Sequence, residues 1–248
     1  MEKADVTQGH LLNGRIDYAQ PKDGYRTGIE PVLLAAAVPA RSGARVLEAG
    51  TGAGAGLLCL ATRVPGIAGL GVEIEPRMAA LAARNFAANG FEGLSARVAD
   101  ILDIAADATG LGGPFDHAMA NPPWHPTAGT PSPVPLRARA KVAGAGLVTA
   151  WTQTLGRLLR PRGSLTLILP ARQVPEALAA LPAAGCGSPR LFPLWPRAGQ
   201  PARILLLQAI RGGRAEFRME AGLILHAGTA YTPAAEAVLR EGAALPLD

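Results

Sequence analysis

The chain has 248 residues, 49% of them hydrophobic, and a formal net charge of +5 at pH 7. This length allows one large domain, or one domain with an appendage, around a sizeable core. No run of about 18 apolar residues lacks charges or prolines, so no membrane span is expected, and the polar first five residues do not resemble a secretory signal. Two cysteines, Cys59 and Cys186, are too few for a disulfide framework or a structural zinc site, and the four histidines lack metal-ligand spacing. We therefore expect a cytoplasmic protein without a metal.

The predicted elements alternate between strands and helices. Residues 1–40 are expected to form an extension, and residues 41–248 a single domain without linkers or repeats. The alternation predicts a mainly parallel sheet with right-handed crossovers, and the last two strands an antiparallel edge. In chain order, the extension has a turn at 22–24 and a helix at 30–38; strands follow near 45–49, 67–73, 94–99, 115–120, 164–169, 203–210 and 221–225, with helices near 53–63, 76–89, 137–159 and 174–181.

A glycine-rich loop joins the first strand of the domain to its helix. It runs from Glu48 to Gly56 and carries glycines at every second position from Gly50. Glycines between a strand and a helix let a ligand approach the backbone and expose the amides of the helix N-terminus. The loop also fits the dinucleotide pattern G-x-G-x-x-A, so the glycines alone do not choose a cofactor.

An acid ends the second strand of the domain. Glu73 lies 21 residues beyond Gly52, the spacing at which a carboxylate grips ribose hydroxyls. Glu75 is close enough to be a rival for this role.

The most informative segment is Asn121-Pro122-Pro123-Trp124, which follows the predicted strand 115–120. The two prolines fix the backbone and remove two amide donors. Asn121 supplies a carbonyl acceptor, a neighbouring peptide carbonyl can supply a second, and Trp124 offers a flat apolar face. This combination suits a planar group that carries an NH2; the alternative is a proline turn with a surface tryptophan.

Together these motifs resemble the class I methyltransferases that use S-adenosylmethionine. The resemblance implies a Rossmann-like fold with a mainly parallel seven-stranded sheet, helices on both faces and an antiparallel C-terminal edge. It implies that Asp100 holds the adenine of the cofactor. It also implies that the N-P-P-aromatic segment is the motif of those enzymes that methylate planar amino groups. The cofactor-binding residues implied in this way, by motif, are Glu48, Gly50, Gly52, Gly54, Glu73, Asp100 and Asn121.

The ends of the chain narrow the resemblance. The segment 24–35 and the tail motifs at 193–197, 225–226 and 231–233 are similar to the bacterial adenine-N6 methyltransferases that modify the purine beside the anticodon of valine tRNA. The resemblance implies that Arg26 and Thr27 close the methionine end of the cofactor. One position departs from the pattern, because tyrosine or phenylalanine usually stands where this chain has Trp124.

Charge divides the chain into two regions. Residues 1–130 hold 10 basic and 13 acidic side chains, whereas residues 131–248 hold 14 basic and 6 acidic ones. Such an excess favours a phosphate-rich partner such as tRNA. The alternative is compositional: a GC-biased genome explains the preference for arginine over lysine, but not the scarcity of acids in one half. Arg137, Arg139 and Lys141 follow the N-P-P-W segment and are candidate RNA-binding residues; the alternative is a solvated helix start.

The chemistry predicted for the site is methyl transfer to an exocyclic amine. Asn121 and the Pro122 carbonyl would accept the two N–H hydrogens, Trp124 would stack on the base, and no metal is required. His125 adjoins the site and is most simply a loop residue. Open alternatives are methylation of guanine N2 in ribosomal RNA, methylation of protein glutamine, and a non-catalytic cofactor-binding module; a dinucleotide oxidoreductase leaves the N-P-P-W segment unexplained. The sequence does not define the oligomeric state.

Overall fold

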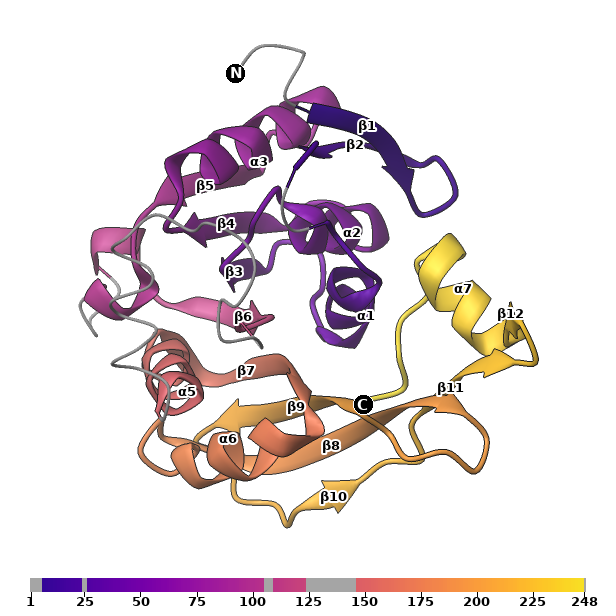
Figure 1. Ribbon diagram of the computed structural model, residues 1–248. Helices are drawn as coiled ribbons and strands as arrows, with labels where there is room; N and C mark the ends of the chain where they lie inside the picture. The colour runs from indigo at the N-terminus through magenta and orange to yellow at the C-terminus, as the bar shows by residue number, and fades with distance from the viewer. Residues whose placement is uncertain (1–5, 24–25, 105–108, 124–145, 248) are drawn as a thin grey trace.

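The computed structural model describes residues 6–23, 26–104, 109–123 and 146–247, and in this part of the chain a twisted ten-stranded sheet separates two groups of helices (Figure 1). The strand order is β12-β11-β8-β9-β7-β6-β3-β4-β5, with β10 paired to β8. The parallel half comprises β3 (Arg45–Ala49), β4 (Ala68–Glu73), β5 (Leu94–Val98), β6 (Phe115–Ala120) and β7 (Leu159–Pro170).

The C-terminal half of the sheet mixes directions. β9 runs antiparallel to both β7 and β8, and β12 runs antiparallel to β11, so the predicted antiparallel edge is confirmed. The predicted count of seven strands is too low, because the sheet also contains β8, β10 and β12, which were not among the predicted strands. The strands of this half are β8 (Cys186–Arg197), β9 (Ile204–Arg211), β10 (Arg218–Met219), β11 (Leu223–Ala227) and β12 (Ala230–Tyr231).

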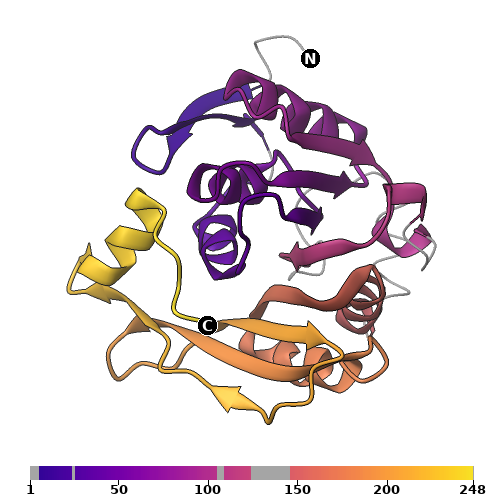
Figure 2. The ribbon, with the colours of Figure 1, turned by 180° about the vertical axis from the view of Figure 1, so that it is seen from behind.

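Helices cover both faces of the sheet, as the sequence predicts. In Figure 1, α1 and α2 lie inside the curve of the sheet and α5 and α6 outside it, and the view from behind in Figure 2 agrees. One face carries α1 (Glu30–Ala37), α2 (Ala55–Arg63), α3 (Pro76–Ala88) and α7 (Pro233–Glu241), and the other carries α5 (Leu147–Arg157), α6 (Val174–Ala180) and the short helices η2 (Ile101–Asp103), η3 (Thr109–Leu111) and η4 (Ala171–Gln173). Within the described ranges, no helix has both the length and the apolarity needed to span a bilayer.

Two hydrophobic cores lie on the two faces of the sheet. Along β3, Val46 packs into the core beneath α1 and α2 while Leu47 packs into the core beneath α5 and α6. Met119 of β6 joins the first core, and its neighbour Ala118 the second. Strands buried on both faces read as continuous apolar runs, which is why the sequence predicts them well. Each large side chain buried in this way stabilises the fold by about 1.5–3 kcal/mol.

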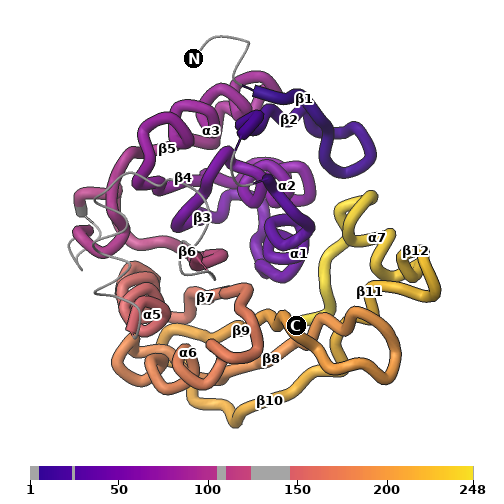
Figure 3. The backbone as a smooth tube through the Cα atoms, viewed as in Figure 1, coloured from indigo at the N-terminus to yellow at the C-terminus, as the bar shows by residue number. Residues whose placement is uncertain are grey.

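The N-terminal extension contains a β-hairpin that the sequence analysis missed. It consists of β1 (Val6–Leu11) and β2 (Ile16–Pro21), and lies beside α3 in the tube view of Figure 3. Its turn uses positive φ at Leu12, Asn13 and Gly14. The Asn85 amide of α3 accepts from the Ala19 amide and donates to the Ala19 carbonyl, so the hairpin is fastened to the domain.

The structure differs from the sequence prediction at one further strand and one helix. The predicted strands omit β8, a 12-residue strand at the centre of the C-terminal half. The helix predicted over 137–159 is helical from Leu147 to Arg157, and β7 begins at Leu159; the part before residue 146 lies outside the described residues.

Candidate cofactor and substrate site

Four parallel strands end side by side at one edge of the sheet. Ala49 of β3 is in register with Val72 of β4 and with Ala120 of β6, and Glu73 of β4 is in register with Val98 of β5. In open parallel sheets the carboxyl ends of the strands form the usual ligand crevice. The structure therefore brings the glycine loop, both strand-end acids and the start of the N-P-P-W segment to one edge.

The glycine loop depends on glycine at its alternate positions. Gly50, Gly52 and Gly54 have φ values of 65°, 58° and 89°, in the left-handed region that side chains rarely adopt. A Cβ on Gly54 would also lie 2.5 Å from the Phe86 ring. The loop leads directly into α2, whose N-cap residue is Gly54.

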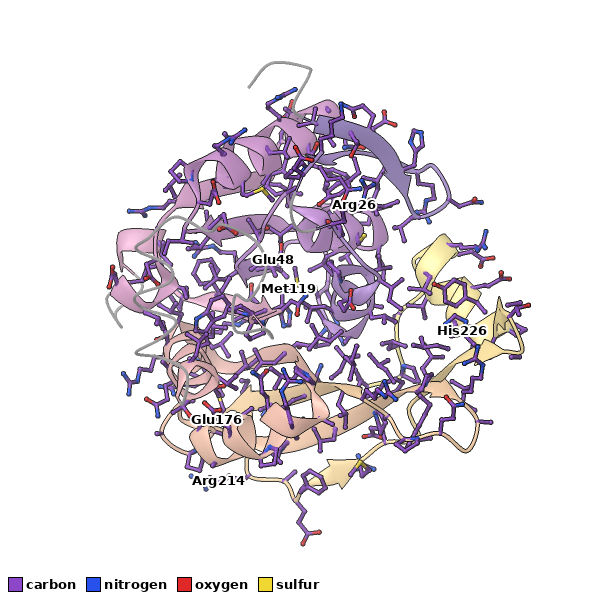
Figure 4. The ribbon with its side chains drawn as sticks, in the orientation of Figure 1. Arg26, Glu48, Met119, Glu176, Arg214 and His226 are labelled. Atoms are coloured by element: carbon purple, nitrogen blue, oxygen red, sulfur yellow. The ribbon has the colours of Figure 1, made fainter. Side chains whose placement is uncertain are left out.

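Glu48 lies beneath the loop rather than at its surface. Its side chain is 5% exposed, and its carboxylate accepts from the Thr51 hydroxyl at 2.5 Å and from the Leu57 amide at 3.2 Å. Burial raises the pKa of Glu48 to about 7. Figure 4 shows the side chain inside the molecule, near Met119, its register partner on β6. The structure thus makes Glu48 a support of the loop.

Glu73 joins the end of β4 to the glycine loop. One carboxylate oxygen accepts from the Gly52 amide at 2.9 Å, and the other accepts from the Glu75 amide at 3.0 Å. Glu75 itself precedes α3 at the N-cap position, where its side chain makes no capping hydrogen bond. Of the two rival acids, Glu73 is the one whose carboxylate contacts the loop.

Asp100 follows β5 and begins a short helix. Its carboxylate accepts from the Leu102 amide at 2.9 Å. The apolar side chains of Ile74 and Leu102, which lie close to the two strand-end acids in sequence, are 37% and 38% exposed. The sequence analysis missed both; the available signal was an apolar residue directly after, or two after, each acid.

Arg26 and Thr27 connect the hairpin to α1. Arg26 is exposed, and the Thr27 hydroxyl lies 2.8 Å from the Tyr18 hydroxyl. The same region is joined to the glycine loop, because Asn85 donates to the Ala53 carbonyl as well as to Ala19. The extension is therefore packed against the candidate cofactor site.

Asn121, Pro122 and Pro123 leave the sheet directly beside the glycine loop. Asn121 is half-buried, Pro122 is buried and Pro123 is exposed. Ala120, the residue before them, pairs with Ala49 on one side and with Leu167 on the other. The other predicted residues of this region, Trp124, His125, Arg137, Arg139 and Lys141, lie outside the described residues.

Trp151 of α5 is a site residue that no sequence pattern indicated. A Cβ added to Gly50 would lie 3.0 Å from its indole ring. Trp151 therefore closes the side of the glycine loop that faces α5, and it excludes a larger residue at position 50. Among the described residues no group of three or more His, Cys, Asp or Glu side chains gathers as a metal site.

Comparison with known proteins defines the class. The methyltransferase domain family matches residues 40–195, and the chain belongs to this family. A crystal structure described as a predicted O-methyltransferase from Agrobacterium tumefaciens superposes with a TM-score of 0.72 at 27% identity, covering 87% of this chain and 97% of that one. The structure of TrmN from Thermus thermophilus shares the fold, with a TM-score of 0.51 at 20% identity, covering 74% of this chain and 47% of that one. The predicted class, an S-adenosylmethionine-dependent methyltransferase with a Rossmann-like fold, is confirmed.

The particular relatives are more informative. A tRNA1(Val) (adenine(37)-N6)-methyltransferase of Dickeya chrysanthemi is 30% identical over 200 residues, 80% of this chain and 78% of that protein. Its counterpart in Aeromonas salmonicida is 31% identical over 84% of this chain and 85% of its own length. A release factor glutamine methyltransferase of Rhodospirillum rubrum is 36% identical, but over only 45% of this chain and 32% of that protein. The predicted resemblance to the tRNA1(Val) adenine-N6 methyltransferases is confirmed.

Proposed function

We propose that this enzyme transfers the methyl group of S-adenosylmethionine to the N6 amine of an adenine in the anticodon loop of valine tRNA. The observation that carries the proposal is the position of Asn121-Pro122-Pro123, which begins where β6 ends, one strand from the glycine loop. The relatives matched over most of the chain are named for this reaction. A tRNA substrate implies a cytoplasmic enzyme.

The residues at the sheet edge fit the cofactor. The glycine loop leaves room for close approach, and the Glu73 carboxylate lies 2.9 Å from the Gly52 amide, at the height where ribose hydroxyls would be held. Asp100 would bind the adenine, and the exposed side chains of Ile74 and Leu102 would cover its faces. Arg26 and Thr27 would close the methionine end, with residues 1–40 acting as the extension that completes the site.

Asn121 would supply the catalytic acceptor. When bound, S-adenosylmethionine provides an electrophilic methyl group on its sulfonium. The target amine is a weak nucleophile, because its lone pair is delocalised into the purine ring. The Asn121 side-chain oxygen and the Pro122 carbonyl would accept its two N–H hydrogens and stabilise the positive charge that develops on nitrogen. The rigid diproline would hold both acceptors in line with the methyl group, and Trp124 would stack on the base.

The charge of the second half supports an RNA substrate. Residues 131–248 carry 14 basic and 6 acidic side chains, and Arg137, Arg139 and Lys141 follow the target segment in sequence. Phosphate neutralisation by such side chains releases counterions and drives association. Methylation of guanine N2 in ribosomal RNA would use the same charge.

Protein glutamine is the second candidate substrate. It is favoured by the release factor methyltransferase relative of Rhodospirillum rubrum, which matches this chain over 112 residues. A planar amide would fit the same acceptors. A glutamine substrate does not require phosphate contacts, so this alternative does not explain the excess of basic side chains in residues 131–248.

The test is methyl transfer from labelled S-adenosylmethionine to three parallel substrates: unmodified total tRNA, ribosomal RNA and release factor. Products are digested and resolved by mass. We expect N6-methyladenosine from valine tRNA alone. Label in guanine or glutamine would reassign the substrate, and no transfer to any substrate, with the cofactor bound, would support a non-catalytic module.

A further inference from the structure

The three tail motifs of the sequence converge at one corner of the sheet. His226 of β11 is in register with Arg197 of β8, and it is also paired with Tyr231 of β12. The rings of His226 and Tyr231 stack with their centroids 4.7 Å apart. The Arg197 guanidinium donates to the Gly228 carbonyl in the β11–β12 turn at 3.2 Å. Residues from three strands thus hold Arg197 in place at the end of β8.

A hollow of about 390 Å³ opens beside this arginine, in the hairpin between β8 and β9. It is lined by Pro196, Arg197, Gln200, Pro201 and Arg203. The turn is closed by the Gln200 amide donating to the Arg197 carbonyl at 3.2 Å, and two prolines stiffen it. The lining therefore contains two guanidinium groups and no acid on a rigid frame.

The acids nearest in sequence, Glu216 and Glu220, do not line the hollow, and two other acids of the C-terminal half are engaged elsewhere. Glu176 of α6 accepts from both the amide and the hydroxyl of Thr149, and Glu236 of α7 pairs with Arg240. Both Arg197 and Arg203 are exposed, and neither takes part in an ion pair between described residues. Their positive charge is accordingly available to a ligand.

The hollow lies on the same edge of the sheet as Asn121. β6 and β7 are parallel, and because β9 is antiparallel to both β7 and β8, β8 runs in the same direction as β6. Their carboxyl ends therefore face the same way. Three strand spacings separate β6 from β8, which is roughly 15 Å. Leu191 is the residue of β8 that is level with Ala120, and Arg197 lies six residues beyond it, which is roughly 20 Å farther along the strand. The Ala171 amide donates to the Arg203 carbonyl at 2.8 Å and fixes the hairpin to the end of β7.

We propose that this hollow binds backbone phosphates of the RNA substrate several nucleotides from the base that enters the site. The inference rests on the proposed function. The two offsets combine to roughly 25 Å, which at roughly 3.4 Å of axial rise per nucleotide corresponds to about seven nucleotides. Guanidinium groups suit phosphate because they donate in a planar fork, and the preformed turn lowers the cost of ordering them. The phosphate contacts position the RNA, and the site around Asn121 selects the base.

The test uses the double variant Arg197→Ala/Arg203→Ala in the full-length enzyme with valine tRNA. We expect tRNA affinity to fall about tenfold or more, and the slope of log affinity against log salt to decrease by about 1.5–2, one contact per arginine. The KM for tRNA should rise in parallel, while kcat at saturating tRNA and the affinity for S-adenosylmethionine stay unchanged.

Two controls define the interpretation. Arg214→Ala removes one arginine charge beyond the far end of β9, and Figure 4 shows Arg214 and His226 at opposite ends of the C-terminal half; we expect no effect on binding. Arg197→Gln/Arg203→Gln keeps a donor for Gly228, and should reproduce the loss if the alanine variant is unstable. Wild-type methylation of tRNA with an unchanged salt slope in both double variants would overturn this inference alone. A wild-type enzyme that neither binds nor methylates tRNA would overturn the proposed function and this inference with it.

Discussion

The two halves of one sheet edge carry opposite chemistry. Where β4 and β5 end, the chain places the carboxylates of Glu73 and Asp100. Where β8 ends and β9 begins, it places the guanidinium groups of Arg197 and Arg203. The sequence shows the same contrast, with 13 acids against 10 bases in residues 1–130 and 6 against 14 in residues 131–248.

The contrast indicates how a small enzyme can hold two ligands at one edge. Carboxylates accept hydrogen bonds from hydroxyl and amino groups, which a nucleoside carries, whereas guanidinium groups donate to phosphates. Asn121, at the end of β6, lies between the two regions. Separate variants should therefore affect the cofactor, the RNA and the chemical step independently.

The largest expected effect is on the rate of methyl transfer, at Asn121 between the two regions. Asn121→Ala should lower the rate of methyl transfer by about 10²–10³, the range found when one stabilising hydrogen-bond group is removed from a preorganised site. Single-turnover transfer measures the rate, and calorimetry with S-adenosylmethionine measures cofactor binding. An unchanged rate with normal cofactor binding would exclude the proposed role of Asn121.

The next largest effect is a loss of cofactor affinity, caused by a change in the acidic half of the edge. Gly50→Ala should weaken S-adenosylmethionine binding by about tenfold or more, because a side chain would be strained at a φ of 65° and would meet the Trp151 ring. The matched control is Gly90→Ala, at a φ of 71° with nothing within 4 Å of the added Cβ. Equal losses of cofactor affinity in the two variants would show a general folding effect instead.

A smaller change should separate cofactor from RNA. Glu73→Gln retains the shape of the side chain but loses its charge, and we expect affinity for S-adenosylmethionine to fall about five- to tenfold, since charged hydrogen bonds are stronger than neutral ones. Binding of tRNA without cofactor, followed by fluorescence anisotropy, should not change. A loss of tRNA affinity would mean that the two halves are not independent.

The smallest effect concerns Glu48 and pH. Burial raises its pKa to about 7, so the folded state retains a proton that the unfolded state releases near pH 4.5. Between these values the folded state binds more protons, and stability should fall as pH rises, by at most about 1.4 kcal/mol per pH unit. Glu48→Gln should remove this slope in urea unfolding, and leave cofactor affinity within threefold if Glu48 only supports the loop.

His117 has the opposite effect on the pH dependence of stability. Burial lowers the pKa of His117 to about 4, and its ring lies 2.8 Å from the Ser164 hydroxyl. The unfolded state then binds more protons between pH 4 and 6.5, so this contribution to stability is lost as pH falls through that window. The difference between wild type and Glu48→Gln cancels it, and a difference that does not depend on pH would contradict the assignment.

Much of the parallel half could be predicted because its strands are apolar runs and its loop positions require glycine. The limits 45–49 and 115–120 were predicted as they occur. The strand β8 was missed because Pro189, Pro193 and Pro196 interrupt the pattern, and proline normally argues against a strand within a sheet. Trp151 could not be found, since its contact with Gly50 exists only after α5 has packed.

The β1–β2 hairpin was not predicted for a different reason. Its Asn13-Gly14 turn is a strong local signal for a β-hairpin, so the sequence contained the information. Its strands are mixed in polarity, because β1 lies at an edge and one face packs on the domain. The strand-end position of the acids was foreseen, whereas the engagement of Glu73 with Gly52 required the folded loop.

Asn85 gives the molecule an unexpected mechanical property. Its single amide group bonds to Ala19 of the hairpin and to Ala53 of the glycine loop. Opening either segment leaves the same buried amide unsatisfied, so the two should open as one cooperative unit. In native-state hydrogen exchange, the amides of β2 should therefore gain protection when S-adenosylmethionine binds, although the hairpin itself need not touch the cofactor.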